Sequence, residues 1–140
     1  MKYLANYDAV FASAHAAGVR LKPEFKALWL TALRSGNYHQ GRGWLRMHVG
    51  GSHSLYCCLG VGYDLSCALD PSVFRWAPRD GENAYETAGG EATVLWADVL
   101  ETWFVPDSSP RFIAVATALY GLNDDGATFE QIADLIEKYL

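Results

Sequence analysis

The sequence is short of charge and lacks long apolar stretches, and both shortages exclude classes of protein. Charged residues make up 19% of the 140 residues, and acidic residues outnumber basic ones by 16 to 11. The formal net charge of −5 is opposite in sign to that of a typical non-specific nucleic-acid binder. No apolar run approaches the roughly 20 residues of a membrane-spanning helix. We therefore expect neither direct nucleic-acid binding nor insertion into a membrane.

Cysteine is also scarce. The chain has three cysteines, of which Cys57 and Cys58 are adjacent and Cys67 follows closely. An odd number at this spacing is unsuited to a disulfide framework. Polar residues such as Asn6 and Asp8 interrupt the N-terminal segment, so that no signal-peptide apolar core is present. The sequence predicts a reduced, cytoplasmic protein.

Apolar and aromatic residues, by contrast, are plentiful. They account for 51% and 14% of the chain, with five Trp and eight Tyr. A chain of this size and composition buries a sizeable core. Because it contains neither internal repeats nor a low-complexity linker, we expect one globular domain over residues 1–140. Large amphipathic rings fill cores, and they are also enriched at binding surfaces.

Hydrophobic periodicity predicts a mainly helical fold. Pro23 suits a first helical turn and Gly36 a helix stop, while Asp70-Pro71 ends a third helix. Thr128 and Gln131 have the spacing of a capping box before the last helix. The helices are expected over residues 3–17, 23–36, 55–69, 112–122 and 129–140, with a short one in 96–104.

Two other segments favour extended structure. Residues 73–95 are rich in strand-forming side chains and are broken by turn sequences at 79–83 and 89–90, which indicates an antiparallel hairpin or meander. A short extended piece is also expected over residues 44–49. The predicted fold class is therefore α+β, a mainly helical single domain with a small antiparallel β-hairpin or meander.

The adjacent cysteines support two interpretations. A catalytic thiolate needs a neighbouring base or cation, and His53 lies four residues before Cys57. Both cysteines nevertheless stand in an apolar run, which favours the neutral thiol of a core residue. We prefer a packed position inside the third helix, and keep a thiol enzyme using Cys57 or Cys58 as an alternative.

Motifs for metals and phosphates are incomplete. A zinc site would need a second pair of ligands. A calcium loop built on residues 123–126 would place Gly121 and Ile132 at ligand positions, and neither side chain binds a cation. The glycines near residue 41 lack the rest of a P-loop or dinucleotide motif. We expect no metal, no cofactor and no catalytic residue.

Residues 37–54 form the best candidate for a functional segment. This connection is long, polar and rich in glycine, and it lies between two well-predicted helices. Binding residues concentrate on such loops. Its basic and aromatic side chains suit an anion or an acidic patch on a partner. The candidate ligand-binding or partner-binding residues are Tyr38, His39, Gln40, Arg42, Trp44 and Arg46.

Three blocks of sequence together resemble a known group of proteins. They read Ala-Leu-Arg-Ser-Gly-x-Tyr-x-Gln-Gly-x-Gly-x-Leu-Arg over residues 32–46, Tyr-Cys-Cys-Leu-Gly-Val over 56–61, and Leu-Asn-Asp-Asp-Gly-Ala-Thr-Phe over 122–129, followed by Ile-Ala-Asp-Leu-Ile-Glu. In this order they resemble a family of small uncharacterised proteins encoded by bacteriophages and prophages. The family carries no established activity, but phage genes of this size often encode host-takeover or anti-defence factors.

The resemblance and the composition lead to three functional hypotheses. The first is a non-enzymatic phage or prophage accessory protein in the cytoplasm of a bacterial host, which binds a host or phage protein complex as an anti-CRISPR-like inhibitor. The second is an oligomeric small-molecule binder that sequesters a nucleotide signal through Tyr38, Gln40, Arg42 and Arg46; a homo-oligomer is compatible with the sequence. The third is the thiol enzyme.

Overall fold

The helices dominate the computed structural model, which describes residues 4–50, 53–79, 83–108 and 111–140. The helical elements are α1 (Leu4–Ala16), α2 (Pro23–Arg34), α3 (Cys58–Leu69), α4 (Ala97–Leu100), the 3-10 helix η1 (Pro106–Ser108), α5 (Phe112–Asp124) and α6 (Phe129–Tyr139). The strands are β1 (His39–Gln40), β2 (Arg46–His48), β3 (Ser54–Tyr56), β4 (Ala77–Pro78) and β5 (Tyr85–Glu86). The predicted α+β class is confirmed.

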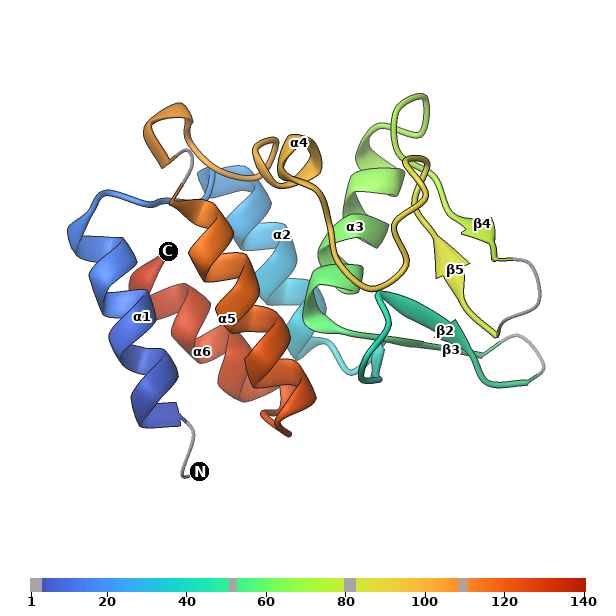
Figure 1. The fold of residues 1–140 in the computed structure, drawn as a ribbon, viewed down its shortest axis with the longest axis horizontal. Helices are drawn as coiled ribbons and strands as arrows, with labels where there is room; N and C mark the ends of the chain where they lie inside the picture. The colour runs from blue at the N-terminus through green and yellow to red at the C-terminus, as the bar shows by residue number, and fades with distance from the viewer. Residues whose placement is uncertain (1–3, 51–52, 80–82, 109–110) are drawn as a thin grey trace.

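The elements are arranged in three parts along the long axis of the molecule. Helices α1, α2, α5 and α6 gather at one end, the strands lie at the other, and α3 stands between them (Figure 1). None of the helices in the described ranges has the length and apolar character needed to cross a bilayer.

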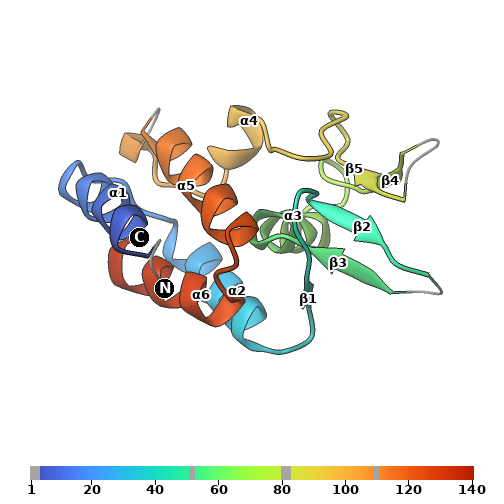
Figure 2. The same ribbon diagram turned by 60° about the horizontal axis from the view of Figure 1, so that its bottom comes forward.

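The strands form two small sheets that are joined to each other. Strand β3 pairs with β1 in parallel and with β2 antiparallel, and β4 pairs antiparallel with β5 as the predicted hairpin. An isolated bridge between Met47 and Ala84, and a 2.8 Å hydrogen bond from the backbone N–H of His48 to the carbonyl of Asn83, connect β2 to the hairpin segment. Figure 2 shows the two sheets beside α3.

One helix prediction is wrong at its start. Residues 55–57 were expected in the third helix, but Leu55 and Tyr56 belong to β3 and α3 begins at Cys58. A short apolar run has no periodicity that separates a buried strand from a helical turn. Strand β3 pairs with β1 on one side and with β2 on the other. This pairing favours the extended state over the helix, because it satisfies the backbone hydrogen-bonding groups of β3.

Two side chains cap the start of α3. Cys57 is its N-cap residue, and its Sγ accepts a 3.3 Å hydrogen bond from the N–H of Gly60. The N–H of Cys58 donates instead to Oδ1 of Asn123, at 3.2 Å. The first N–H groups of a helix have no partner within it, so these two bonds stabilise the helix end. Cys57 therefore lies just outside the helix rather than inside it.

Asn123, near the end of α5, joins three segments. Its side chain is fully buried. Nδ2 donates a 2.8 Å hydrogen bond to the carbonyl of Gly41, while Oδ1 accepts from the N–H of Cys58 and, at 2.9 Å, from Nε2 of Gln40. A buried carboxamide is tolerated only when such partners are present. The segment after β1, the start of α3 and the end of α5 are thereby held together.

Close packing around two tryptophans fixes α3 against the group of helices formed by α1, α2, α5 and α6. Trp29 and Trp103 are almost completely buried, with ring centroids 5.3 Å apart. Nε1 of Trp29 donates to the carbonyl of Cys58 at 3.0 Å, and Nε1 of Trp103 donates to Oγ of Ser66 at 2.9 Å. On the strand side, a Cβ added to Gly60 would lie 1.8 Å from the carbonyl oxygen of Leu45, so only glycine permits this approach.

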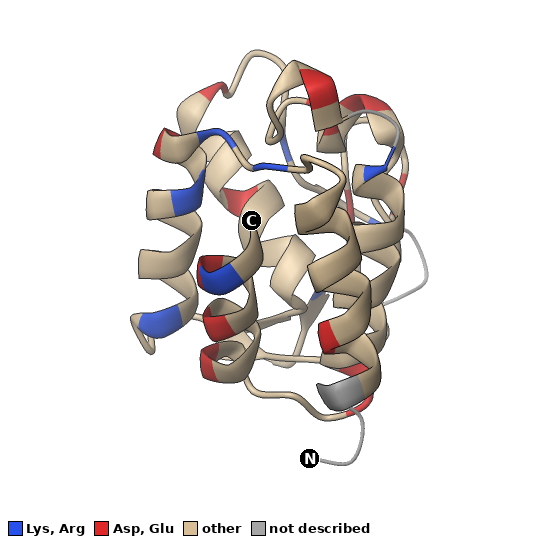
Figure 3. Cartoon of the chain, turned by 90° about the vertical axis from the view of Figure 1, so that its left-hand side faces the viewer, with Lys and Arg blue, Asp and Glu red and all other residues tan. Residues whose placement is uncertain are grey.

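The predicted capping box is present, and ion pairs that the sequence did not predict join α2 to α6. Thr128 and Gln131 form the capping box at the start of α6. Arg34 of α2 pairs with three carboxylates of α6, those of Glu130, Asp134 and Glu137, at 3.3, 2.7 and 2.9 Å. Figure 3 shows acidic positions of α6 beside basic positions of α2. The charges thus complement the apolar packing between these helices.

We predict that Asn123→Ala lowers the free energy of unfolding by about 2–4 kcal/mol, because it leaves the Gly41 carbonyl and the Cys58 N–H buried without partners. Urea unfolding followed by circular dichroism measures the change. The matched control is Asn37→Ala, at an exposed position, which should stay within about 0.5 kcal/mol of the native value. Equal stability of the two variants would contradict the role assigned to Asn123.

Candidate binding surface

The structure separates the predicted residues of the 37–54 segment into two groups. One group faces the end of α5. Nε2 of Gln40 donates to the carbonyl of Ala127 at 2.7 Å as well as to Asn123, and the N–H of Gly43 donates to Asp124 at 3.0 Å. The Arg42 guanidinium lies close to Gly126, since a Cβ added there would be 3.4 Å from Nη2. These contacts give Gln40 a structural role.

Tyr38 and Arg46 form the second group, because both contact the ring of Tyr56. His39 is exposed on β1, and Trp44 is half-buried before β2. Neither residue has a ring contact with the second group in the described residues.

Arg46 is surrounded by aromatic rings. Its Cζ lies 4.0 Å from the ring centroid of Tyr85, 5.4 Å from that of Tyr56 and 5.6 Å from that of Trp76. Nε donates a 3.0 Å hydrogen bond to Oγ of Ser54. Within the described ranges Arg46 forms no ion pair, and Nε is the only one of its nitrogens with a hydrogen-bond partner. The half-buried guanidinium is thus held by cation–π contacts, with its terminal nitrogens available.

Asp64 of α3 fixes the aromatic side chains around Arg46. Its carboxylate accepts a 2.5 Å hydrogen bond from the hydroxyl of Tyr38 and a 2.9 Å bond from Nε1 of Trp76. The Tyr38 and Tyr56 rings meet edge to face, with centroids 5.0 Å apart. Burial, and then the hydrogen bond to Asp64, raise the pKa of Tyr38 above its usual range. Tyr38 therefore stays protonated and continues to donate.

These six half-buried residues form one patch, which we call the Arg46 surface. It consists of Tyr38, Arg46, Tyr56, Asp64, Trp76 and Tyr85.

Sequence reasoning found two members of this surface and missed four. Tyr56 pairs directly with Arg46 across the β2–β3 ladder, so an earlier recognition of β3 would have found it. Asp64, Trp76 and Tyr85 come from α3 and from the hairpin segment. No local pattern links these residues to the 37–54 segment, because tertiary packing brings them together.

The adjacent thiols are buried, whereas the histidine considered as their base is exposed. Cys57 and Cys58 are both buried, whereas His53 is exposed in the connection between β2 and β3. Desolvation raises the pKa of Cys57 to about 12 and that of Cys58 well above its ordinary value. The Cys58 thiol lies 3.5 Å from the carbonyl of Leu119 and donates to it. Both groups are neutral near pH 7, and neutral thiols are poor nucleophiles.

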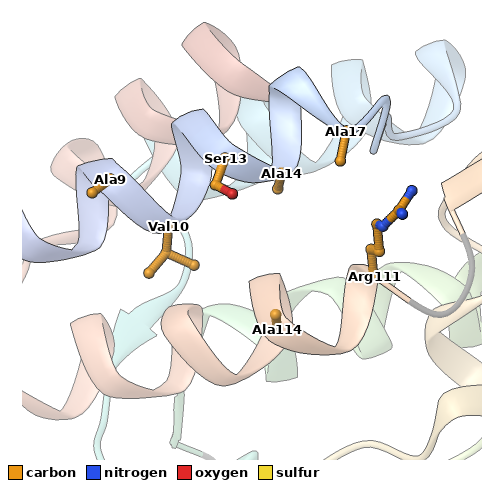
Figure 4. A pocket seen from close by; sticks show the side chains of 7 residues that line it. All are labelled: Ala9, Val10, Ser13, Ala14, Ala17, Arg111 and Ala114. Atoms are coloured by element: carbon orange, nitrogen blue, oxygen red, sulfur yellow. The ribbon is translucent and has the colours of Figure 1, made fainter.

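A groove of about 440 Å³ runs between α1 and α5 (Figure 4). Its walls are mostly small apolar side chains, together with the Ser13 hydroxyl and, at one end, the Arg111 guanidinium. It offers apolar contact but no acid–base pair. The lining residues are Ala9, Val10, Ser13, Ala14, Ala17, Arg111 and Ala114.

Metal ligands do not gather in the part of the chain that the structure describes. No group of three or more His, Cys, Asp or Glu there is placed to hold an ion.

A family model for a domain of unknown function matches residues 21–140 of the chain. The chain belongs to the DUF8296 family. The matched range of the DUF8296 domain contains every residue of the Arg46 surface, while α1, and with it one wall of the groove, precedes that range. Comparison with the curated proteins and with the solved structures gives no match.

We predict that iodoacetamide does not modify Cys57 or Cys58 of the native protein near neutral pH, because both thiols are buried and protonated. Mass spectrometry of the labelled peptides measures this. Both residues should react fully once the protein is unfolded in urea. Cys67, which is half-buried and whose pKa burial raises to about 11, should react slowly and provides an internal comparison. Modification of Cys57 or Cys58 within minutes in the native protein would support the thiol enzyme.

Proposed function

We propose that this protein is a non-enzymatic binding protein and that its partner docks on the Arg46 surface. The observation that carries the proposal is the Arg46 guanidinium, which lies among the rings of Tyr56, Trp76 and Tyr85 without an ion pair in the described ranges.

The composition of this surface supports protein recognition. Trp, Tyr and Arg are the residues that most often dominate the binding energy of protein interfaces. Asp64 holds Tyr38 and Trp76 in place before any partner arrives. Such preorganisation reduces the conformational entropy that is lost on binding.

The terminal nitrogens of Arg46 indicate the chemistry of the partner. A guanidinium presents parallel N–H groups that match a carboxylate in a bidentate arrangement. The surrounding aromatic rings would exclude water from that pair. The lower local dielectric would strengthen the attraction between the two charges. We infer that the partner protein presents an Asp or Glu side chain to Arg46, with apolar contacts to the adjacent rings.

The biological setting of the proposal comes from the sequence resemblance. We propose that the protein is a phage or prophage accessory factor that inhibits a host defence complex in the bacterial cytoplasm, as anti-CRISPR proteins do. The support is the ordered resemblance of three sequence blocks to small phage-encoded proteins. The family match itself assigns no function.

The nucleotide-binding hypothesis has weaker support. Tyr38 and Arg46 lie together and would suit a base and a phosphate. Gln40, which that hypothesis also requires, uses its amide N–H groups within the protein. Arg42 lies near Gly126, with the other group of loop residues.

We predict that Arg46→Lys weakens partner retention about tenfold or more, because lysine keeps the charge but loses the planar, bidentate group. The measurement is an affinity pull-down from lysate of a bacterial host, quantified by mass spectrometry. The control is Arg75→Lys, an exposed arginine whose backbone, not its side chain, bonds Tyr63. Thermal melting establishes that both variants are folded.

Three results would count against the proposal. The first is that the native protein retains no stoichiometric partner, and the second is that Arg46→Lys retains a partner as well as the native protein does. The third is that a nucleotide from a panel of cyclic and ADP-ribose-type compounds raises the melting temperature and that Arg46→Lys abolishes this rise.

A further inference from the structure

A second site lies next to the Arg46 surface, on the far side of the contact between the Trp76 and Tyr63 rings. Here a cavity of about 260 Å³ is enclosed by α3, the segment after it and the connection from β5 to α4. Aromatic and acidic side chains line it, and Lys, Arg and His are absent from its lining. The residues that matter below are Tyr63, Phe74, Gly89, Glu91, Trp96 and Asp98.

Glu91 is the unusual member of this lining. The residue is only 6% exposed. One carboxylate oxygen accepts a short hydrogen bond from the hydroxyl of Thr87, and the other accepts a 2.9 Å bond from the N–H of Trp96. A carboxylate has about four acceptor positions, so roughly half of its capacity is used. Glu91 forms no ion pair within the described ranges, and no Lys, Arg or His of the described residues lines the cavity beside its carboxyl group.

The surroundings of Glu91 suit an organic cation. Trp96 is 57% exposed and contributes a ring next to the carboxylate. Gly89 brings the two together: a Cβ added there would lie 2.5 Å from Oε1 of Glu91 and 3.7 Å from Cζ3 of Trp96. Glycine at this position therefore lets the backbone pack against the Glu91 carboxyl group close to the Trp96 ring. A cation in the cavity that both side chains line would gain a charge-assisted hydrogen bond and a cation–π contact.

We propose that this cavity binds an alkylammonium group, from either a free amine or a lysine side chain of a partner protein. Glu91 pairs with the ammonium, the Trp96 ring covers it, and Asp98 adds negative charge at the rim. The volume is below the roughly 300 Å³ at which pockets for drug-sized ligands begin, so one side chain or one small amine fills it. The proposal does not rest on the Arg46 surface, because the two sites share no residue.

The experiment is an NMR titration of the ¹⁵N-labelled protein with n-butylammonium chloride, with 1-butanol as the uncharged isostere. We expect saturable shifts of the Gly89 amide and the Trp96 indole N–H with the ammonium, and none with the alcohol. Two peptides that differ only by Lys or Ala at the centre identify the source. A lysine peptide that binds at least about tenfold more tightly than butylammonium indicates a protein partner, and equal affinity indicates a free amine.

Three variants test the assigned roles. Glu91→Gln keeps an acceptor for the Trp96 N–H but removes the charge, and it should weaken binding about tenfold or more. The Trp96 side chain is exposed, so we expect Trp96→Ala to fold normally. This variant should weaken ammonium binding about threefold or more. Glu101→Gln, an exposed carboxylate outside the cavity lining, is the control and should leave the affinity unchanged.

The proposal is overturned if butylammonium causes no saturable shift, or if butanol causes the same shifts. It is also overturned if Trp96→Ala binds as tightly as the native protein, a result that does not depend on whether Glu91→Gln folds. Because this titration needs no macromolecular partner, its outcome is independent of the pull-down that tests the Arg46 surface.

Discussion

The buried carboxamide of Asn123 is the constraint on which the rest of the structure depends. It spans 65 residues to reach the first N–H of α3 and 82 residues to reach the carbonyl of Gly41. Both groups lack another partner in regular structure, because one begins a helix and the other follows a strand. Residues from three separate stretches of the sequence, 32–46, 56–61 and 122–129, meet at this side chain.

The junction at Asn123 also positions the Arg46 surface. It fixes where α3 starts, and therefore where Asp64 lies on that helix. Asp64 in turn orients Tyr38 and Trp76, which border the half-buried guanidinium. Trp76 of this surface also contacts Tyr63, which lines the Glu91 cavity, with ring centroids 4.7 Å apart. The two proposed sites are therefore neighbours that share one aromatic contact.

Local signals predicted the helices well and the site poorly. Pro23, the Thr128–Gln131 capping box and the 3.6-residue periodicity act within a few residues, so the limits of α2 and α6 follow from them. Cys57 and Cys58 were correctly placed in the core, but Cys57 turned out to be a helix cap. Leu55 and Tyr56 were assigned to a helix because their extended state depends on strands that lie elsewhere in the chain. Gln40 stays a predicted binding residue, and its amide N–H groups donate to Asn123 and Ala127 in the structure.

The sequence by itself determined the class of fold, the buried state of the adjacent cysteines and the absence of a membrane-spanning helix from the described residues. These properties depend on composition, on periodicity and on contacts between near neighbours. Tertiary structure alone decided which polar residues are structural and which are available. Asn123 and Glu91 are both buried polar residues. The Asn123 carboxamide has partners within the protein at both its oxygen and its nitrogen, whereas Glu91 lines a cavity and forms no ion pair within the described ranges. That difference arises from groups brought together across the chain, and no local pattern encodes it.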